Sequence, residues 1–279
     1  MDAPRHDRSF GVQRLGFGVS GPQGSPLVSY RATEALIMRA YELGVRLFDT
    51  GPSYGNGEAE RRLGEVMSRL PPSDCIISTK VGISSYGLMG RRRDFSPDAI
   101  RRSLDGSMKR LKAHRLDWVF LHGPAPSELT DALFKTMEAE QKSGRVGVLG
   151  LAGRGSEIDA AINTGLFRVF MAPVHSGLTP ESLARLKRIK ASGAELIGIE
   201  VLAASLSPTP LPTGTGSLWR FMRGVAGRGT RPPPRRVPVH QAIQWALTTG
   251  GAHRIVSTTT RVERLEQNVI SAREAPELP

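Results

Sequence analysis

Cysteine is almost missing from this sequence of 279 residues, which contains only Cys75. A single thiol cannot form an intrachain disulfide or a zinc site, so neither kind of fold is expected. We expect Cys75 to be an inert core residue in a reducing compartment.

Long hydrophobic runs are also absent. No stretch of about 18 apolar residues could span a membrane, and the polar start MDAPRHDRSF lacks the apolar segment of a signal peptide. The sequence therefore predicts a cytoplasmic protein with no membrane partner.

Acidic residues are outnumbered, with 26 Asp and Glu against 38 Lys and Arg, which gives a formal net charge of +12. Such a surplus leaves nucleic-acid binding open as an alternative. However, no aromatic residues interleave with the basic clusters at 91–94 and 231–236, as a stacking platform for bases would need. We expect these clusters to be solvated loops and expect no nucleic-acid partner. A hydrolase is disfavoured because neither G-x-S-x-G nor H-E-x-x-H occurs.

The stretch GFGVSG, residues Gly16 to Gly21, matches the G-x-G-x-x-G fingerprint of a dinucleotide-binding turn. That fingerprint requires a helix directly after it and an acidic residue roughly 20 residues later. Instead PQGSPLVSY follows, and no acidic residue stands at the expected distance. We predict a strand that runs into a turn, so any dinucleotide must bind elsewhere.

Short β-rich runs alternate with helical ones along the chain, which predicts parallel strands joined by crossover helices. The strands are expected near residues 12–18, 45–50, 75–80, 116–122, 145–152, 167–173, 195–201 and 254–259. The helices are expected to begin near Arg31, Glu58, Pro97, Glu128, Glu157, Pro180, Pro238 and Arg261, with Ser96 and Thr179 as caps before a proline. Eight such units predict a single (β/α)8 TIM-barrel domain over residues 1–279. A Pro-, Gly- and Arg-rich loop at 207–237 follows the seventh strand, as a lid or a flexible insertion.

Ionisable residues close three successive predicted strands, with Asp49 in LFDT, Lys80 in IISTK and His122 in WVFLH. Tyr54 lies in the loop after the second strand. Any one of them could be a capping or snorkelling residue, but strand ends of a barrel meet at one face. A lysine charge favours the ionised form of a neighbouring tyrosine, an aspartate can hold that lysine, and a histidine can polarise a carbonyl oxygen. These residue types suit proton transfer to or from an oxygen.

The stretches LFDTGPSYGNGEAERRLGE, STK, DWVFLHGP and VERLEQN resemble the aldo-keto reductase superfamily, and the resemblance extends from about Leu15 to Ala272. It implies a catalytic tetrad with Tyr54 as general acid, Asp49 and Lys80 as its tuning pair, and His122 orienting the substrate. It further implies hydride transfer between NADPH or NADP+ and a small carbonyl or alcohol substrate, without a metal or flavin. Retention of His122 favours carbonyl reduction over carbon-carbon double-bond reduction.

The segment STTTRVERLEQN is expected to bind the adenosine end of the cofactor. Thr258 and Thr259 precede a helix start, where backbone N–H groups attract phosphate. The resemblance makes Arg264 the ligand of the 2′-phosphate and Asn268 an adenine contact. These two are four residues apart, so we expect them on one helix face, opposite a buried stripe of Val262, Leu265 and Val269.

The nicotinamide end departs from the family pattern. Ala152 and Gly153 stand where the family commonly has Ser-Asn, and Met171 stands where it has glutamine. Glu200 and Val201 replace the Ser and Pro of a Ser-Pro-Leu run that ends at Leu202. Gly153, Met171 and Leu202 are expected to border the cofactor, with His175 or main-chain groups compensating for the lost side chains. A barrel that senses a nucleotide with little turnover is the alternative. Loops 86–93 and 207–237 are expected to set substrate specificity.

Overall fold

Eight parallel strands form a closed barrel in the computed structural model, which describes residues 14–71, 74–86, 90–205 and 236–277. The strands are β1 (Leu15–Gly18), β2 (Leu47–Asp49), β3 (Ile76–Val81), β6 (Leu116–His122), β7 (Val146–Ala152), β8 (Val169–Pro173), β9 (Glu195–Ile199) and β10 (Arg254–Ser257). Each of them coincides with a predicted strand, although β3 extends one residue beyond its predicted end, and β1 closes the barrel by pairing with both β2 and β10. The (β/α)8 prediction is therefore confirmed. Most of the loop predicted at 207–237 lies outside the described residues.

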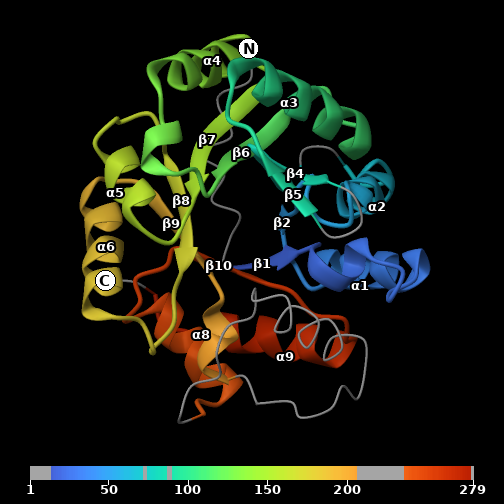
Figure 1. The fold of residues 1–279 in the computed structure, drawn as a ribbon. Helices are drawn as coiled ribbons and strands as arrows, with labels where there is room; N and C mark the ends of the chain where they lie inside the picture. The colour runs from blue at the N-terminus through green and yellow to red at the C-terminus, as the bar shows by residue number, and fades with distance from the viewer. Residues whose placement is uncertain (1–13, 72–73, 87–89, 206–235, 278–279) are drawn as a thin grey trace.

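Helices surround the strands, as Figure 1 shows. They are α1 (Tyr30–Glu42), α2 (Glu58–Met67), α3 (Pro97–Leu111), α4 (Asp131–Lys142), α5 (Ser156–Ile162), α6 (Pro180–Ala191), α8 (Val239–Leu247) and α9 (Val262–Arg273). The predicted caps are confirmed, because the Ser96 and Thr179 side chains accept from backbone N–H groups three residues on. In the described part of the chain, no helix is both long and apolar enough for a membrane crossing.

One helix starts later than predicted. Pro126–Glu128 forms a short 3₁₀ turn, η3, and α4 begins only at Asp131, where the Thr130 side chain caps it. The proline sets the first turn but the chain then leaves the helical path at Leu129, which has φ −81° and ψ 71°.

The glycine fingerprint is a strand and a turn, as predicted. Strand β1 ends at Gly18, and a 3₁₀ turn, η2 (Gly21–Gly24), follows it. The first α-helix starts only at Tyr30. No helix N-terminus lies directly after Gly21, so this segment cannot hold a pyrophosphate in the Rossmann manner.

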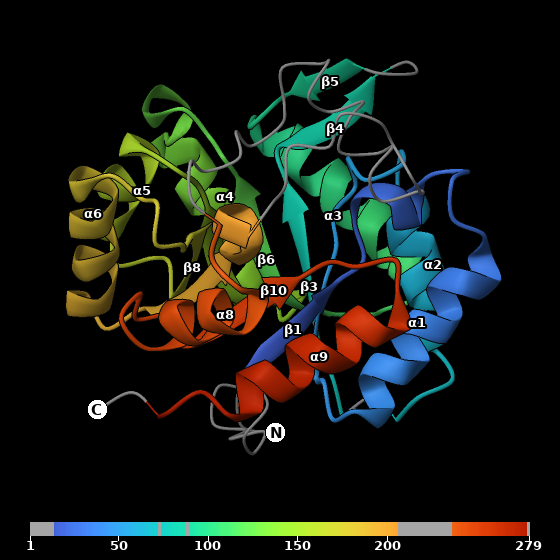
Figure 2. The ribbon, with the colours of Figure 1, turned by 90° about the horizontal axis from the view of Figure 1, so that it is seen from below.

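An antiparallel hairpin, β4 (Ile83–Tyr86) and β5 (Gly90–Arg93), was not predicted, because its polar, arginine-rich sequence lacks the apolar alternation of a strand. It stands at one end of the barrel, away from α9 (Figure 2). The Ser85 hydroxyl donates to the Ser53 carbonyl, and Arg93 donates to the Gly123 carbonyl at 3.0 Å. The hairpin is therefore fixed to the loops that follow β2 and β6.

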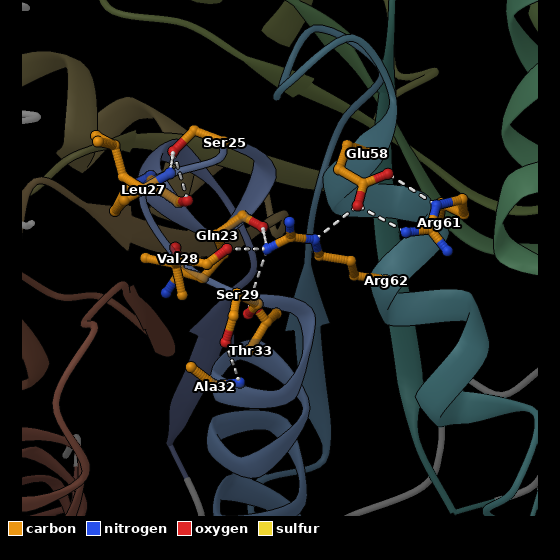
Figure 3. A network of polar contacts seen from close by, with 11 residues as sticks. Gln23, Ser25, Leu27, Val28, Ser29, Ala32, Thr33, Glu58, Arg61 and Arg62 are labelled. Carbon is orange, nitrogen blue, oxygen red and sulfur yellow. Dashed lines mark hydrogen bonds and ion pairs between the residues drawn. The ribbon is translucent and has the colours of Figure 1, made fainter.

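A buried arginine ties the segment after β1 to α2 (Figure 3). Arg62 Nη1 donates to the carbonyls of Gln23 and Val28, each at 2.7 Å, and to the Thr33 hydroxyl at 3.1 Å. Its Nε donates to Glu58 at 2.7 Å, so the buried charge is fully paired. The exposed Arg61 binds the same carboxylate from the surface.

We expect Arg62→Ala to lower the free energy of unfolding by about 3 kcal/mol, since it leaves buried carbonyls without donors. The matched control Arg61→Ala should cost less than about 1 kcal/mol, because its ion pair is solvent-screened. Urea denaturation of both variants measures this. Similar losses in the two would show that the buried network has no special role.

Candidate functional site

The alternation of side chains along a strand brings the candidate residues together. On β2, β3 and β6 the apolar residues Leu47, Ile76 and Phe120 belong to a cluster that fills the barrel interior. Asp49, Lys80 and His122 are an even number of residues further along these strands, so their side chains share this inward direction. All three stand at or next to the carboxyl end of their strand, and they meet at one face of the barrel, which we call the mouth.

Asp49 and Lys80 form a buried ion pair, with 4% and 2% of their surface exposed. Lys80 Nζ donates to the two Asp49 carboxylate oxygens at 2.7 and 2.6 Å and to the Thr50 carbonyl at 2.7 Å. The Ser78 hydroxyl donates to the same carboxylate. Burial is the largest influence on the pKa of Lys80 and lowers it, but the charges of Asp49 and Tyr54 and hydrogen bonds to both outweigh burial and raise this pKa. Lys80 is therefore a fixed positive charge.

Tyr54 lies against this charge, with its ring centroid 5.1 Å from Lys80 Nζ. The turn that carries it approaches η2 so closely that a Cβ added to Gly55 would lie 1.7 Å from the Gly24 carbonyl oxygen. Gly55 also has φ +61°, so only glycine suits this position. Because Arg62 ties η2 to α2, the packing that fixes this segment also positions Tyr54.

His122 faces Tyr54 edge to face, with ring centroids 6.1 Å apart and an interplanar angle of 73°. Burial, followed by the positive charge of Lys80 and of Arg91, Arg154 and Arg93, lowers the pKa of His122 to about 3. The imidazole is therefore neutral near pH 7. A neutral imidazole beside a tyrosine hydroxyl can donate a hydrogen bond to a carbonyl oxygen without competing as an acid.

Polar atoms that lack a partner gather around the mouth. In the described residues, four buried side-chain atoms have no hydrogen-bond partner: Gln23 Oε1, Ser53 Oγ, His122 Nδ1 and Ser205 Oγ. They belong to β6 and to the segments that follow β1, β2 and β9. Buried polar atoms are normally hydrogen-bonded. This group of atoms without partners therefore indicates a surface where a polar ligand would supply the missing hydrogen bonds.

The predicted adenosine segment is joined to the loop after β1. The Thr258 hydroxyl lies 3.1 Å from the Gly18 carbonyl and 3.1 Å from the Ser20 hydroxyl. Gln23 Nε2 donates to the Thr259 carbonyl at 2.7 Å. These contacts fix the backbone just before α9.

Arg264 and Asn268 do not share one environment, which corrects the expectation of a common face opposite the buried stripe. Arg264 is exposed, with no hydrogen bond or ion pair to another described residue, whereas Asn268 is 3% exposed and its Nδ2 donates to Ser257 at 3.0 Å. At 100° per residue, Asn268 is only about 60° from the buried Leu265, so it falls on the edge of the buried stripe.

The residues expected near the nicotinamide offer few side-chain groups. Met171 is 1% exposed inside the barrel, and Leu202 packs against the core in a 3₁₀ turn, η4 (Val201–Ser205). Gly153 N–H donates to the Met171 carbonyl at 2.9 Å, and a Cβ on Gly153 would lie 2.6 Å from Glu157 Oε1. His175 Nδ1 accepts from the Gly177 N–H.

A charged pair at the mouth was missed from the sequence. Arg154 follows β7 and donates to both carboxylate oxygens of Glu200, which follows β9. The sequence pattern marks Glu200 only as the replacement for a serine and gives Arg154 no role. The available signal was a charged residue within two residues of each of two strand ends that face one mouth.

Comparison with known proteins agrees with this geometry. A model of the Aldo/keto reductase family matches residues 14–206. L-galactose dehydrogenase from Arabidopsis thaliana is 30% identical over 207 residues, 70% of this chain and 63% of that protein. D-threo-aldose 1-dehydrogenase from Pseudomonas sp is 31% identical over 147 residues, 46% of this chain and 45% of that protein. These matches span less than two thirds of either relative. The holo form of an aldo-keto reductase from Bacillus halodurans has a TM-score of 0.76 at 21% identity and covers 96% of this chain and 89% of that chain.

The lowered pKa of His122 predicts a stability effect in acid. Between about pH 3 and pH 6.5 the unfolded chain binds the proton and the folded chain does not, so stability falls as the pH drops through this window. From pH 7 to pH 5 the wild type should lose about 2 kcal/mol more free energy of unfolding than His122→Asn. Urea denaturation at both pH values measures the difference, and equal losses would contradict the neutral imidazole.

Proposed function

Because the chain belongs to the aldo/keto reductase family, we propose that it interconverts a carbonyl group and an alcohol with NADPH or NADP+, using Tyr54 as general acid and base. The observation that carries this proposal is the buried ion pair of Lys80 and Asp49 directly beside Tyr54. Oxidoreductase chemistry on carbonyl groups follows from the family. The cofactor preference and the roles of single residues are proposed.

The four residues divide the proton chemistry among them. Lys80 stabilises the phenolate that forms when Tyr54 gives its proton to the carbonyl oxygen, and Asp49 keeps Lys80 charged and in place. Neutral His122 donates a hydrogen bond to the same oxygen and so orients the carbonyl. In the oxidative direction the Tyr54 oxygen takes the proton back from the alcohol. The bound nicotinamide cofactor supplies or accepts the hydride.

Groups that could bind such a cofactor lie around the mouth and on α9. The partnerless buried atoms of Gln23, Ser53, His122 and Ser205 offer polar groups around the mouth. Arg264, exposed and without an ion-pair partner among the described residues, offers a charge for a 2′-phosphate. The names of the two relatives refer to sugars, so we propose polyhydroxylated aldehydes as the first substrates to test.

Tyr54→Phe should abolish turnover while NADPH still binds, since the variant removes only the transferred proton. Positioned acid catalysis contributes about 10²–10⁴-fold. Lys80→Met should also slow the reaction, because the phenolate loses its charge partner. NADPH consumption over a panel of carbonyl compounds measures turnover. Nucleotide-dependent fluorescence quenching measures cofactor binding. A loss smaller than about tenfold in Tyr54→Phe would reject its role. Cofactor binding by the wild type without turnover on any compound would favour the nucleotide-sensing alternative.

Arg264→Ala should weaken NADPH binding by about 2 kcal/mol, the size of a lost charge-assisted contact with phosphate, and leave NADH nearly unchanged. Arg261→Ala is the matched control, because Arg261 is equally exposed at the start of the same helix but lies near Glu263. Equal losses for both nucleotides would show that Arg264 has only a structural role.

A further inference from the structure

Arg154 and Glu200 bridge two strand ends at the mouth. Strands β7, β8 and β9 are neighbours in the barrel, so a pair between the residues after β7 and after β9 passes over the end of β8. Arg154 Nη1 lies 2.6 Å from Glu200 Oε2, and Nη2 contacts the other carboxylate oxygen. The Arg154 side chain is 58% exposed and that of Glu200 23%. The pair is therefore formed in advance and accessible.

Both residues are held firmly by their backbones. The N–H groups of Arg154 and Gly155 donate to Glu157 Oε1 at 2.5 and 3.0 Å. Glu200 has φ +55°, a left-handed conformation that costs a non-glycine residue about 1 kcal/mol or more. Such a conformation persists only where the surroundings enforce it, and here it places the carboxylate opposite Arg154.

The pair lies at the reacting centre. His122 pairs with Ala152 across β6 and β7, so Arg154 stands two residues beyond the strand partner of His122. Its charge also acts on both Tyr54 and His122. The neighbouring side chains offer little hydrogen bonding. Ala152 and Gly153 have no side-chain donor or acceptor, and Met171 has only a weak thioether acceptor. Together with His175, which follows β8 and whose Nδ1 accepts from the Gly177 N–H, Arg154 and Glu200 are the polar side chains at these strand ends, and these two carry the charges.

The chemistry of the pair selects its ligand. A guanidinium has five N–H donors and a carboxylate has about four acceptor sites, which is more than their mutual bidentate contact uses. An anion would be repelled by Glu200 and a cation by Arg154. A neutral group that both donates and accepts, such as a primary amide, satisfies both partners.

We propose that Arg154 and Glu200 anchor the nicotinamide carboxamide, with Arg154 donating to its oxygen and Glu200 accepting from its NH₂ group. This inference rests on the proposed function, because hydride transfer at Tyr54 and His122 requires the nicotinamide ring, and with it the carboxamide, beside these residues. The two are positioning residues for the cofactor.

Equilibrium binding of NADP+ and of 2′,5′-ADP, which lacks the nicotinamide, tests the proposal in the full chain. Arg154→Ala and Glu200→Ala should each weaken NADP+ about tenfold and leave 2′,5′-ADP within about twofold, as expected for a lost hydrogen bond to a charged group. Arg188→Ala is the control, since Arg188 forms a comparable exposed pair with Asp159 on the outer helices and should change neither nucleotide.

A cofactor analogue isolates the contribution of Glu200. The 3-acetylpyridine analogue of NADP+ keeps the carbonyl oxygen but lacks the NH₂ donor. The wild type should bind it about tenfold more weakly than NADP+, and Glu200→Ala should bind the two equally. Glu200→Gly, which relieves the left-handed strain, should behave as Glu200→Ala and so separates the lost carboxylate from a disturbed backbone.

Two outcomes would overturn the proposal. The first is unchanged NADP+ affinity in both alanine variants, and a raised KM for hydroxylated aldehydes in the same variants would then assign the pair to the substrate. The second is an equal loss for NADP+ and 2′,5′-ADP, which would indicate a structural role. A wild type that binds neither nucleotide would instead reject the proposed function itself.

Discussion

The buried contact between Lys80 and Asp49 is the interaction on which the site depends. Burying two charges costs several kcal/mol per ion, and only complete pairing offsets this. Here each proton of Lys80 has an acceptor, in the two Asp49 oxygens and the Thr50 carbonyl. Since the partners belong to neighbouring strands, β2 and β3, the barrel register determines the pair. The resulting fixed positive charge defines the surroundings of both Tyr54 and His122.

Elsewhere in the described part of the chain, buried polar side-chain atoms have hydrogen-bond partners, which makes the mouth distinctive. Glu60 is fully buried between α2 and β3, yet it accepts from Thr79 Oγ1 at 2.5 Å and from Arg110 Nε at 2.6 Å. Buried Arg62 has four oxygen partners. By contrast, the partnerless buried atoms of the described residues belong to β6 and to the segments that follow β1, β2 and β9. A polar ligand at this face would give these atoms hydrogen-bond partners. We therefore expect ligand binding to stabilise this part of the protein.

The fold and the convergence of Asp49, Lys80 and His122 were predictable from sequence because both follow from local patterns. Strand ends such as LFDT and WVFLH place a polar residue in phase with the inward apolar ones, and a closed barrel brings such ends together. The hairpin of β4 and β5 was not predictable, since its stability comes from contacts with Ser53 and Gly123, which are distant in sequence. The pairing of Arg154 with Glu200 likewise depends on the strand order of the barrel, in which β8 lies between β7 and β9. The periodicity of the sequence carries no information about this long-range pairing.

Gly153 shows that an apparent loss in the sequence is part of a different arrangement. An asparagine at this position would place its Cβ 2.6 Å from Glu157 Oε1 and displace the carboxylate that accepts from the Arg154 N–H. Glycine therefore allows Glu157 to hold the turn that presents Arg154 to Glu200. The missing amide side chain and the charged pair are therefore linked through Glu157, because its carboxylate occupies the space that a larger residue would fill and fixes the turn that carries Arg154.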